Sequence, residues 1–284
     1  MGREDVRRYV ETSDCVILLG AFLTDINLGV FTARLDPDRS IYATSEKLSV
    51  RYHNYEDVRF QDFLHGLRRG KLRRRRPGRW PQPIQMFPGA PAHPNAPLTV
   101  RRLFECLNAF LAEDTVVVCD VGEALFGAAD LYIRRGTDFL GPAYYASMGF
   151  AVPASLGLQL ANPRARPLVL VGDGAFQMTG MEISSVLRYG LNPIVVVLNN
   201  RGFGTERPMQ DGPYNDVAPW QYHRVPEVVG GGRGFLVRTE ADLCQALGAA
   251  AKYKESFSLL EVLLDPNDHS PALQRLTQRL AKRI

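Results

Sequence analysis

Pro167-Leu-Val-Leu-Val-Gly-Asp-Gly174 and, further along the chain, Ile194-Val-Val-Val-Leu-Asn-Asn200 are the two stretches that decide the fold. Each begins as a short apolar run typical of a buried strand in a parallel sheet, and a helical segment separates them. Polar groups follow each run, at the strand ends where open α/β sheets bind ligands. There Asp173 offers a carboxylate, Asn200 an amide oxygen and Gly202 an exposed backbone carbonyl. Such oxygen ligands suit Mg²⁺ or Ca²⁺ and not zinc, so the pattern predicts a metal site.

The alternation of strands and helices extends over residues 98–270 and predicts one α/β domain, a parallel sheet flanked by helices. Further strands are expected at residues 115–119, 234–237 and 258–264. Helices are expected at residues 99–111, at residues 146–160 and from Thr239, where a capping pattern begins. The tail, residues 271–284, is expected to form a polar amphipathic helix.

Residues 1–66 are expected to form only part of a second α/β domain. Short helices are predicted at residues 5–13 and 60–67, with strands at residues 15–20 and 40–44. Two or three parallel strands cannot bury both faces of a sheet, so this partial domain is expected to lack its first half. Residues 67–97, rich in arginine and proline, are predicted to be a linker.

The formal net charge of +4 has a local source in and beside this linker. Its basic residues are Arg68, Arg69, Lys71, Arg73, Arg74, Arg75, Arg76 and Arg79. Such a run can bind nucleic acid. Prolines interrupt and follow it, however, and no aromatic ladder accompanies it, so a solvated linker is the favoured interpretation.

Composition argues against a membrane or secreted protein. No apolar run approaches the roughly 18 residues of a membrane span, and the charged N-terminus has no signal-peptide core. The cysteines are scattered without metal-binding spacing and are expected to be buried free thiols; they are Cys15, Cys106, Cys119 and Cys244. These features predict a cytoplasmic protein.

The Gly-Asp-Gly and Asn-Asn groups, separated by the 24 residues from Ala175 to Leu198, resemble the diphosphate-binding motif of thiamine diphosphate enzymes. The residues from Arg201 through Glu206 to Trp220 resemble the corresponding region of pyruvate and indolepyruvate decarboxylases. The resemblance implies the thiamine diphosphate-binding fold, with thiamine diphosphate and Mg²⁺ as cofactors. In that family the metal bridges the protein and the cofactor's two phosphates.

The resemblance also implies roles for individual residues. Asp173, Asn200 and the Gly202 carbonyl would hold the metal. The Ala146 carbonyl would accept from the cofactor's amino group, and Met148 would be the wedge that keeps the cofactor bent. The full set of expected cofactor contacts is Asp120, Gly122, Ala146, Ser147, Met148, Gly172, Asp173, Gly174, Ala175, Asn200, Gly202, Phe203 and Gly204.

Glu206 occupies the place of the family's active-site glutamate, which acts as an acid or base near the substrate. A carboxyl in a closed, apolar site has a raised pKa and can donate a proton near neutral pH. Residue type alone would favour a surface glutamate paired with Arg207. Asp120 likewise has an ordinary alternative, as the cap of a helix, and Met148 as a core residue.

A complete enzyme of this family also has a pyrimidine-binding domain, for which this sequence has no counterpart. We therefore expect a partner chain that carries it, in a hetero-oligomer such as an α2β2 assembly. The initial Met1 and the unfinished sheet favour a naturally split enzyme. The alternative is that the sequence is a piece of a longer protein.

The implied reaction is decarboxylation of a 2-oxo acid through an enamine intermediate. A carboligase or acyl-transferase that uses the same intermediate is an alternative, because Phe203-Gly204-Thr205 departs from the residues usual in pyruvate decarboxylases. Gly204 is expected to open space near the substrate. A non-catalytic, cofactor-binding regulatory subunit is the remaining alternative.

Overall fold

The computed structural model describes residues 2–25, 27–70, 78, 80–82, 94–133, 137–142 and 144–281. Most of the expected linker and the last three residues of the tail lie outside these ranges. The chain divides into two compact units. The smaller comprises Met1–Pro83 with Gln278–Ile284, and the larger is Ile84–Thr277.

The larger unit contains the predicted parallel sheet. Within the described residues its strands follow the order β6-β5-β7-β8-β10-β9, and every neighbouring pair is parallel. Their bounds are β5 Thr115–Cys119, β6 Phe139–Leu140, β7 Arg166–Gly172, β8 Ile194–Asn199, β9 Arg233–Val237 and β10 Ser258–Leu263. The expected α/β class is thus confirmed, and the two motif strands, β7 and β8, are neighbours at the centre.

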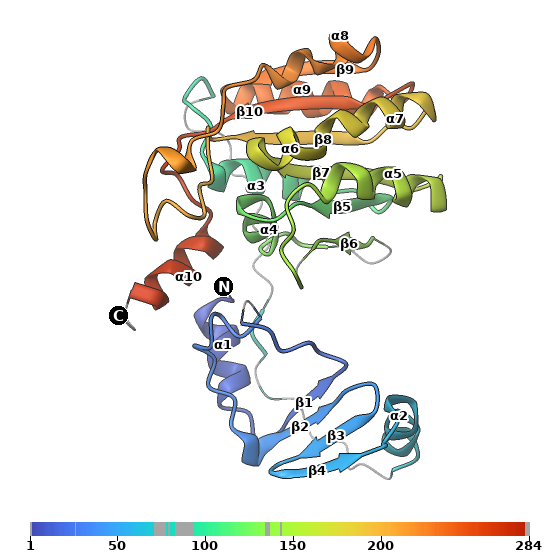
Figure 1. Cartoon of the computed structure of the whole chain (residues 1–284), viewed down its shortest axis with the longest axis vertical. Helices are drawn as coiled ribbons and strands as arrows, with labels where there is room; N and C mark the ends of the chain where they lie inside the picture. Colours follow the sequence, from blue (N-terminus) through green and yellow to red (C-terminus); the bar gives the residue numbers. More distant parts are fainter. Residues whose placement is uncertain are drawn as a thin grey trace. The chain divides into compact units, whose positions relative to one another are not determined.

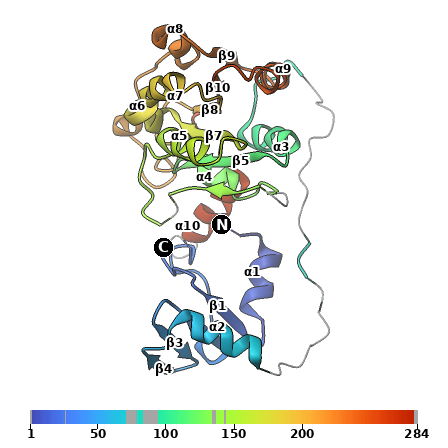
Figure 2. The same ribbon diagram turned by 90° about the vertical axis from the view of Figure 1, so that its right-hand side faces the viewer.

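Helices cover both faces of this sheet, which gives three layers (Figures 1 and 2). One face carries α3 (Val100–Phe110) and α9 (Glu240–Lys252), and the other carries α5 (Ala151–Ala161), α6 (Asp173–Thr179) and α7 (Ile183–Arg188). Successive residues of β7 enter opposite cores: Leu168 and Leu170 join one apolar cluster, and Val169 and Val171 the other. Burial on both faces explains why these strands read as continuous apolar runs.

Two helix starts behave as their side chains predict. The Thr99 hydroxyl accepts a hydrogen bond from Arg102 N at 3.2 Å and begins α3. Thr239 and Asp242 form a reciprocal capping box at α9, which satisfies backbone donors that would otherwise lack partners. No helix in the described part of the chain is long and apolar enough to cross a membrane.

The predicted helix from residue 146 is wrong at its start, because α5 begins only at Ala151. Ala146 has φ 53° and Gly149 has φ 84°, both in the left-handed region that ends or precludes a helix. The buried Asp120 carboxylate holds this turn by accepting from the backbone N–H groups of Gly149 at 3.1 Å and Ala151 at 2.9 Å. The turn therefore depends on a side chain from the end of another strand.

The smaller unit differs more from expectation. Its helices are α1 Glu4–Glu11 and α2 Phe60–Arg69, and its strands are β1 Val16–Leu19, β2 Ser40–Ala43, β3 Lys47–Val50 and β4 His53–Glu56. Among the strands that the structure describes in this unit, β1 and β2 are the only parallel pair, because β3 pairs antiparallel with both β2 and β4. Every residue of β4 is exposed, so no apolar periodicity marked it in the sequence.

The remaining elements are mostly short, apart from the C-terminal helix α10. They are α4 Glu123–Ala128, α8 Val225–Val229, α10 Pro271–Ala281, and the 3-10 turns η1 Pro37–Arg39, η2 Gly180–Glu182, η3 Pro213–Asn215 and η4 Tyr222–Arg224. All four cysteines are free thiols, but the expectation that all are buried is wrong, because Cys15 and Cys244 are exposed.

Replacement of Asp120 by Ala should destabilise the larger unit. The change leaves two buried N–H groups, those of Gly149 and Ala151, without their acceptor. Each unsatisfied donor costs about 1–3 kcal/mol, so we expect the free energy of unfolding to fall by roughly 2–6 kcal/mol. Denaturant unfolding measures this, with Asp120→Asn, which keeps one acceptor oxygen, as the milder variant. A loss below about 1 kcal/mol would show that water replaces the carboxylate.

Candidate functional site

A cavity of about 370 Å³ lies where β5, β7 and β8 end. The segments that follow these strands supply its walls, with one contribution from the turn before α5. It is lined by Val121, Gly122, Glu123, Ala146, Met148, Gly172, Asp173, Gly174, Ala175, Leu198, Asn200, Gly202, Phe203, Gly204, Thr205 and Glu206. Its position at the carboxyl edge of a parallel sheet is the usual one for a ligand site in this class of fold.

The predicted metal ligands converge in this cavity. Asp173 is only 2% exposed, and its Oδ2 accepts a hydrogen bond from Gly202 N at 3.1 Å. The Asn200 Oδ1 accepts from the same N–H group at 3.3 Å. Because one donor serves both oxygens, the carboxylate of one strand end and the amide of the next are held side by side.

Gly202 differs from the expectation of an exposed carbonyl. The residue is buried, and its carbonyl already accepts from Gly204 N at 3.0 Å. A carbonyl oxygen has a second lone pair, which a cation can still use. A side chain at Gly202 would place its Cβ 2.3 Å from the Asn215 backbone oxygen, so only glycine fits here.

Gly204 leaves room for the side-chain amide of Asn200. A Cβ at Gly204 would lie 2.4 Å from the Asn200 Nδ2 atom. The space beside Gly204 is therefore taken by the amide, and the sequence argument that this glycine opens room for substrate loses its basis.

Burial disfavours the ionised form of Asp173 when no cation is bound. Desolvation raises its pKa to about 6, although the N–H groups of Gly174 and Gly202 partly oppose the shift. A bound divalent cation acts in the opposite direction, because it favours the ionised form. A buried carboxylate, an amide oxygen and a backbone carbonyl together form a hard-oxygen donor set, so the residues present fit Mg²⁺.

Glu206 lines the same cavity but is exposed. Its expected alternative, a pair with Arg207, is not what the described residues form, because Arg207 pairs with Asp211 at 2.7 Å and Asp216 at 2.8 Å. Because its side chain is exposed, the surroundings of Glu206 within the described part of the chain are not closed to water. The carboxyl group is therefore available to the cavity and open to water.

Some of the other predicted cofactor contacts line the cavity and others do not. Gly122, with φ 83°, lines the cavity, as do Ala146 and Met148. Met148 also packs against one of the two apolar clusters, so its side chain borders both the cavity and the core, and its role as a wedge stays a prediction. Asp120 and Ser147 do not line the cavity. Burial raises the pKa of Asp120, and its carboxylate serves the turn described above.

Sequence reasoning missed some lining residues, namely Val121, Glu123, Leu198 and Thr205. Three of them are adjacent in sequence to a predicted contact and Leu198 is two residues from Asn200, so proximity was the available signal. Glu123 is also buried, and its Oε1 accepts from Ser270 N at 3.0 Å. No periodicity or motif indicated that contact, because 147 residues separate the two positions.

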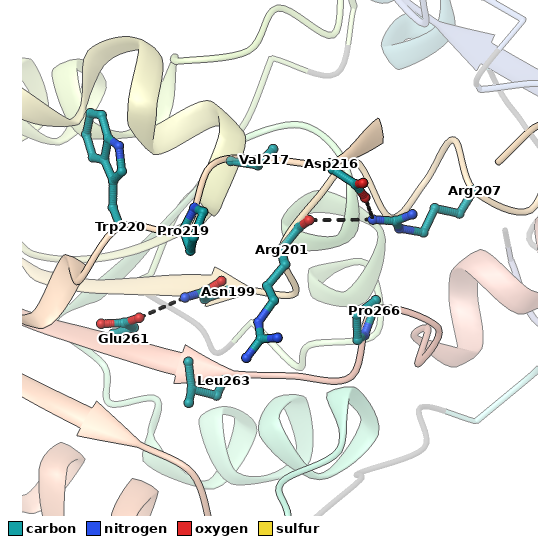
Figure 3. A pocket seen from close by; sticks show the side chains of 10 residues that line it. All are labelled: Asn199, Arg201, Arg207, Asp216, Val217, Pro219, Trp220, Glu261, Leu263 and Pro266. Carbon is teal, nitrogen blue, oxygen red and sulfur yellow. Dashed lines mark hydrogen bonds and ion pairs between the residues drawn. The ribbon is translucent and has the colours of Figure 1, made fainter. Parts of the chain in front are cut away.

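A second cavity, of about 610 Å³, borders the opposite side of the β8 end and contains none of the predicted site residues (Figure 3). Asn199, Arg201, Arg207 and Glu261 are among its lining residues. Its charged groups are largely engaged: Arg207 pairs with Asp216, and Asn199 Nδ2 donates to Glu261 Oε1 at 2.7 Å. The smaller cavity therefore remains the candidate site.

Comparisons with known proteins agree with the predicted family. Residues 120–262 match the family described as thiamine pyrophosphate enzyme, C-terminal TPP binding domain. The chain is 34% identical over 98% of its length to an indole-3-pyruvate decarboxylase of Azospirillum brasilense, and 32% identical over 97% to an alpha-keto-acid decarboxylase of Mycobacterium leprae. It covers 51% and 49% of those proteins, so it spans about half the length of these relatives.

The Gly204→Ala variant should weaken metal binding with little effect on the fold. The added methyl group would displace the Asn200 amide, which is the far end of a side chain and can move. We expect roughly a tenfold loss of Mn²⁺ or Mg²⁺ affinity in the presence of thiamine diphosphate, measured by calorimetry. Gly157→Ala, where nothing lies within 4 Å of the new Cβ, is the matched control. Equal affinities for the two variants would contradict this role of Gly204.

Metal affinity should also depend on pH. Below about pH 6 a proton competes with the cation for Asp173, so affinity should fall by about tenfold for each further pH unit. Conversely, the metal-free protein should lose stability as the pH rises from about 4 to 6, since the native state binds the proton more tightly than the unfolded chain. Titrations with Mg²⁺ between pH 5 and 8 test this, and Asp173→Asn should remove the slope. A flat profile for the unmodified chain would refute it.

Proposed function

We infer that this chain, which belongs to the thiamine pyrophosphate enzyme family, provides the diphosphate- and Mg²⁺-binding half of the active site of a 2-oxo acid decarboxylase. The observation that carries the proposal is that the Gly202 N–H group donates to both Asp173 and Asn200, in a cavity that Glu206 also lines. The relatives' printed names, which describe decarboxylases of indole-3-pyruvate and of alpha-keto acids, support the substrate class.

The chain's own residues would bind and orient the cofactor. Asp173, Asn200 and the Gly202 carbonyl would hold Mg²⁺, and the glycines of the cavity would let the diphosphate approach the backbone. Ala146 and Met148, which line the same cavity, would set the cofactor's orientation. When bound, thiamine diphosphate supplies an electron sink for the carbanion left by loss of carbon dioxide.

Glu206 would hold or move a proton near the reacting carbon. A general acid is most effective when its pKa lies near the working pH, which for a carboxyl requires removal from water. Glu206 is exposed in this chain. We therefore propose that a pyrimidine-domain polypeptide covers it, in a hetero-oligomer such as an α2β2 assembly. The roughly twofold greater length of the relatives supports the need for such a half.

The alternative functions have less support. The argument for a carboligase rested on space beside Gly204, which the Asn200 amide occupies. A non-catalytic, cofactor-binding regulatory subunit would need the metal ligands but not Glu206, which lines the same cavity. The cytoplasmic location and the absence of nucleic-acid binding stay predictions, and the basic run lies mostly outside the described residues.

The chain purified together with its pyrimidine-domain partner should release carbon dioxide from 2-oxo acids such as indole-3-pyruvate. We expect this release to require both Mg²⁺ and thiamine diphosphate. Asp173→Ala should abolish it through loss of the metal, and Glu206→Gln should reduce it about 100-fold while cofactor binding persists. Carbon dioxide release and calorimetric cofactor binding separate these two effects.

Each part of the proposal can fail independently. Unchanged activity of the complex with Asp173→Ala would end the catalytic assignment. Full activity of the isolated chain would end the partner proposal, because Glu206 would then work without a cover. Aldehyde formation without ligation to an added acceptor aldehyde would exclude the carboligase.

A further inference from the structure

A buried hydrogen-bond network lies on the far side of β8 from the candidate site. Glu261, in the middle of β10, is 4% exposed. Its Oε1 accepts from Asn199 Nδ2 at 2.7 Å (Figure 3), and its Oε2 lies 2.5 Å from His223 Nδ1 and accepts from His223 N at 3.1 Å. Both oxygens of one buried carboxylate are thus engaged, from two directions.

This network reaches the metal ligands through the chain itself. Asn199 is the last residue of β8 and borders the larger cavity, whereas the next residue, Asn200, lines the candidate site. The Asn199 backbone is fixed as well, since its carbonyl accepts from Leu264 N at 3.0 Å. With side chain and backbone both held, the direction in which Asn200 leaves the strand is set.

The residue before His223 reaches the other metal ligand. Tyr222 is buried, and its hydroxyl donates to the Asp173 carbonyl at 3.4 Å and accepts from Gln177 Nε2 at 2.9 Å. The short turn η4 therefore contacts Asp173 through Tyr222 and Asn199 through Glu261. This turn therefore connects the residue that follows β7 with the last residue of β8.

The turn is itself anchored on the edge strand. A Cβ at Gly234 of β9 would lie 1.7 Å from the His223 carbonyl oxygen. Only glycine lets the two backbones meet this closely. Close packing against β9 thus supports the His223 end of the network, which continues by hydrogen bonds through Glu261 to Asn199.

We propose that Asn199, Glu261 and His223 form a brace that sets the position of Asn200, so that Glu261 and His223 are positioning residues of the metal site. The inference rests on the proposed function, because it concerns Asn200 as a ligand. Outer partners that orient a metal ligand commonly change metal affinity 10- to 100-fold when removed. The brace should have an effect of this kind although none of its members lines the candidate site.

An exchange of donor and acceptor tests the brace. Asn199→Asp sets two carboxylates against each other, and Glu261→Gln turns an amide donor toward either Asn199 or His223. Each single change should weaken Mn²⁺ binding in the presence of thiamine diphosphate by roughly tenfold. In the double variant the new amide at position 261 can donate to the new carboxylate at position 199, while the amide oxygen accepts from His223. The formal charge is then unchanged, and affinity should return to within about threefold of the unmodified chain.

A matched control separates positioning from general stability. Glu240, another buried carboxylate, accepts from Arg102 Nε at 3.0 Å on the other face of the sheet. Glu240→Gln should lower the melting temperature and leave Mn²⁺ affinity unchanged. Hydrogen exchange at the Gly202 amide gives a metal-free readout, since this N–H group donates to Asp173 and Asn200. Its exchange should rise in both single variants and not in the control.

The outcomes distinguish the inference from its premise. Single variants that match the unmodified chain in affinity and in exchange at Gly202 would overturn the brace. So would a double variant that regains melting temperature without regaining affinity, because the network would then be structural only. Failure of the unmodified chain, together with its pyrimidine-domain partner, to bind Mn²⁺ with thiamine diphosphate would instead refute the proposed function, and exchange at Gly202 would still decide whether the brace orders the loop.

Discussion

The shared hydrogen bond at Gly202 N is the interaction on which the candidate site depends, and it follows from sheet register. β7 and β8 pair in parallel with Val171 opposite Val197 and Gly172 opposite Leu198. A shift of one residue would send Asp173 and Asn200 to different levels of the sheet edge. Apolar burial on both faces specifies that register, because alternate side chains of β7 belong to separate cores. Thus the hydrophobic packing of two strands places two polar groups that take no part in it.

Glycine residues then determine the path that the loop after β8 can take. Gly202 allows the loop to pass the Asn215 carbonyl, and Gly204 leaves room for the Asn200 amide. Gly234, which does not line the site, allows its own backbone and that of His223 to approach closely. These positions are restricted by neighbouring atoms and not by their own dihedral angles, since none of the three has a positive φ. Their tolerance to substitution is therefore a property of the packing around them.

Local sequence information predicted the central sheet and most of the cavity, because buried parallel strands and the residues just after them have strong signatures. It failed where the determining contact comes from far along the chain. The start of α5 depends on Asp120, about thirty residues earlier, and Glu123 is held by Ser270. The exposed strand β4 had no apolar pattern at all. The role of Glu261 was equally hidden, because a glutamate within an apolar run does not reveal its partners.

Burial of Asp173 has a consequence for the life of the protein in the cell. A carboxylate that is costly to ionise without a cation makes the unloaded protein the less stable form near neutral pH. Ligand binding to the native state shifts the folding equilibrium by mass action, and proteases act on the open population. The supply of the divalent cation would then influence how much of the protein escapes proteolysis, so that the abundance of the protein follows the fraction that is loaded with the cation.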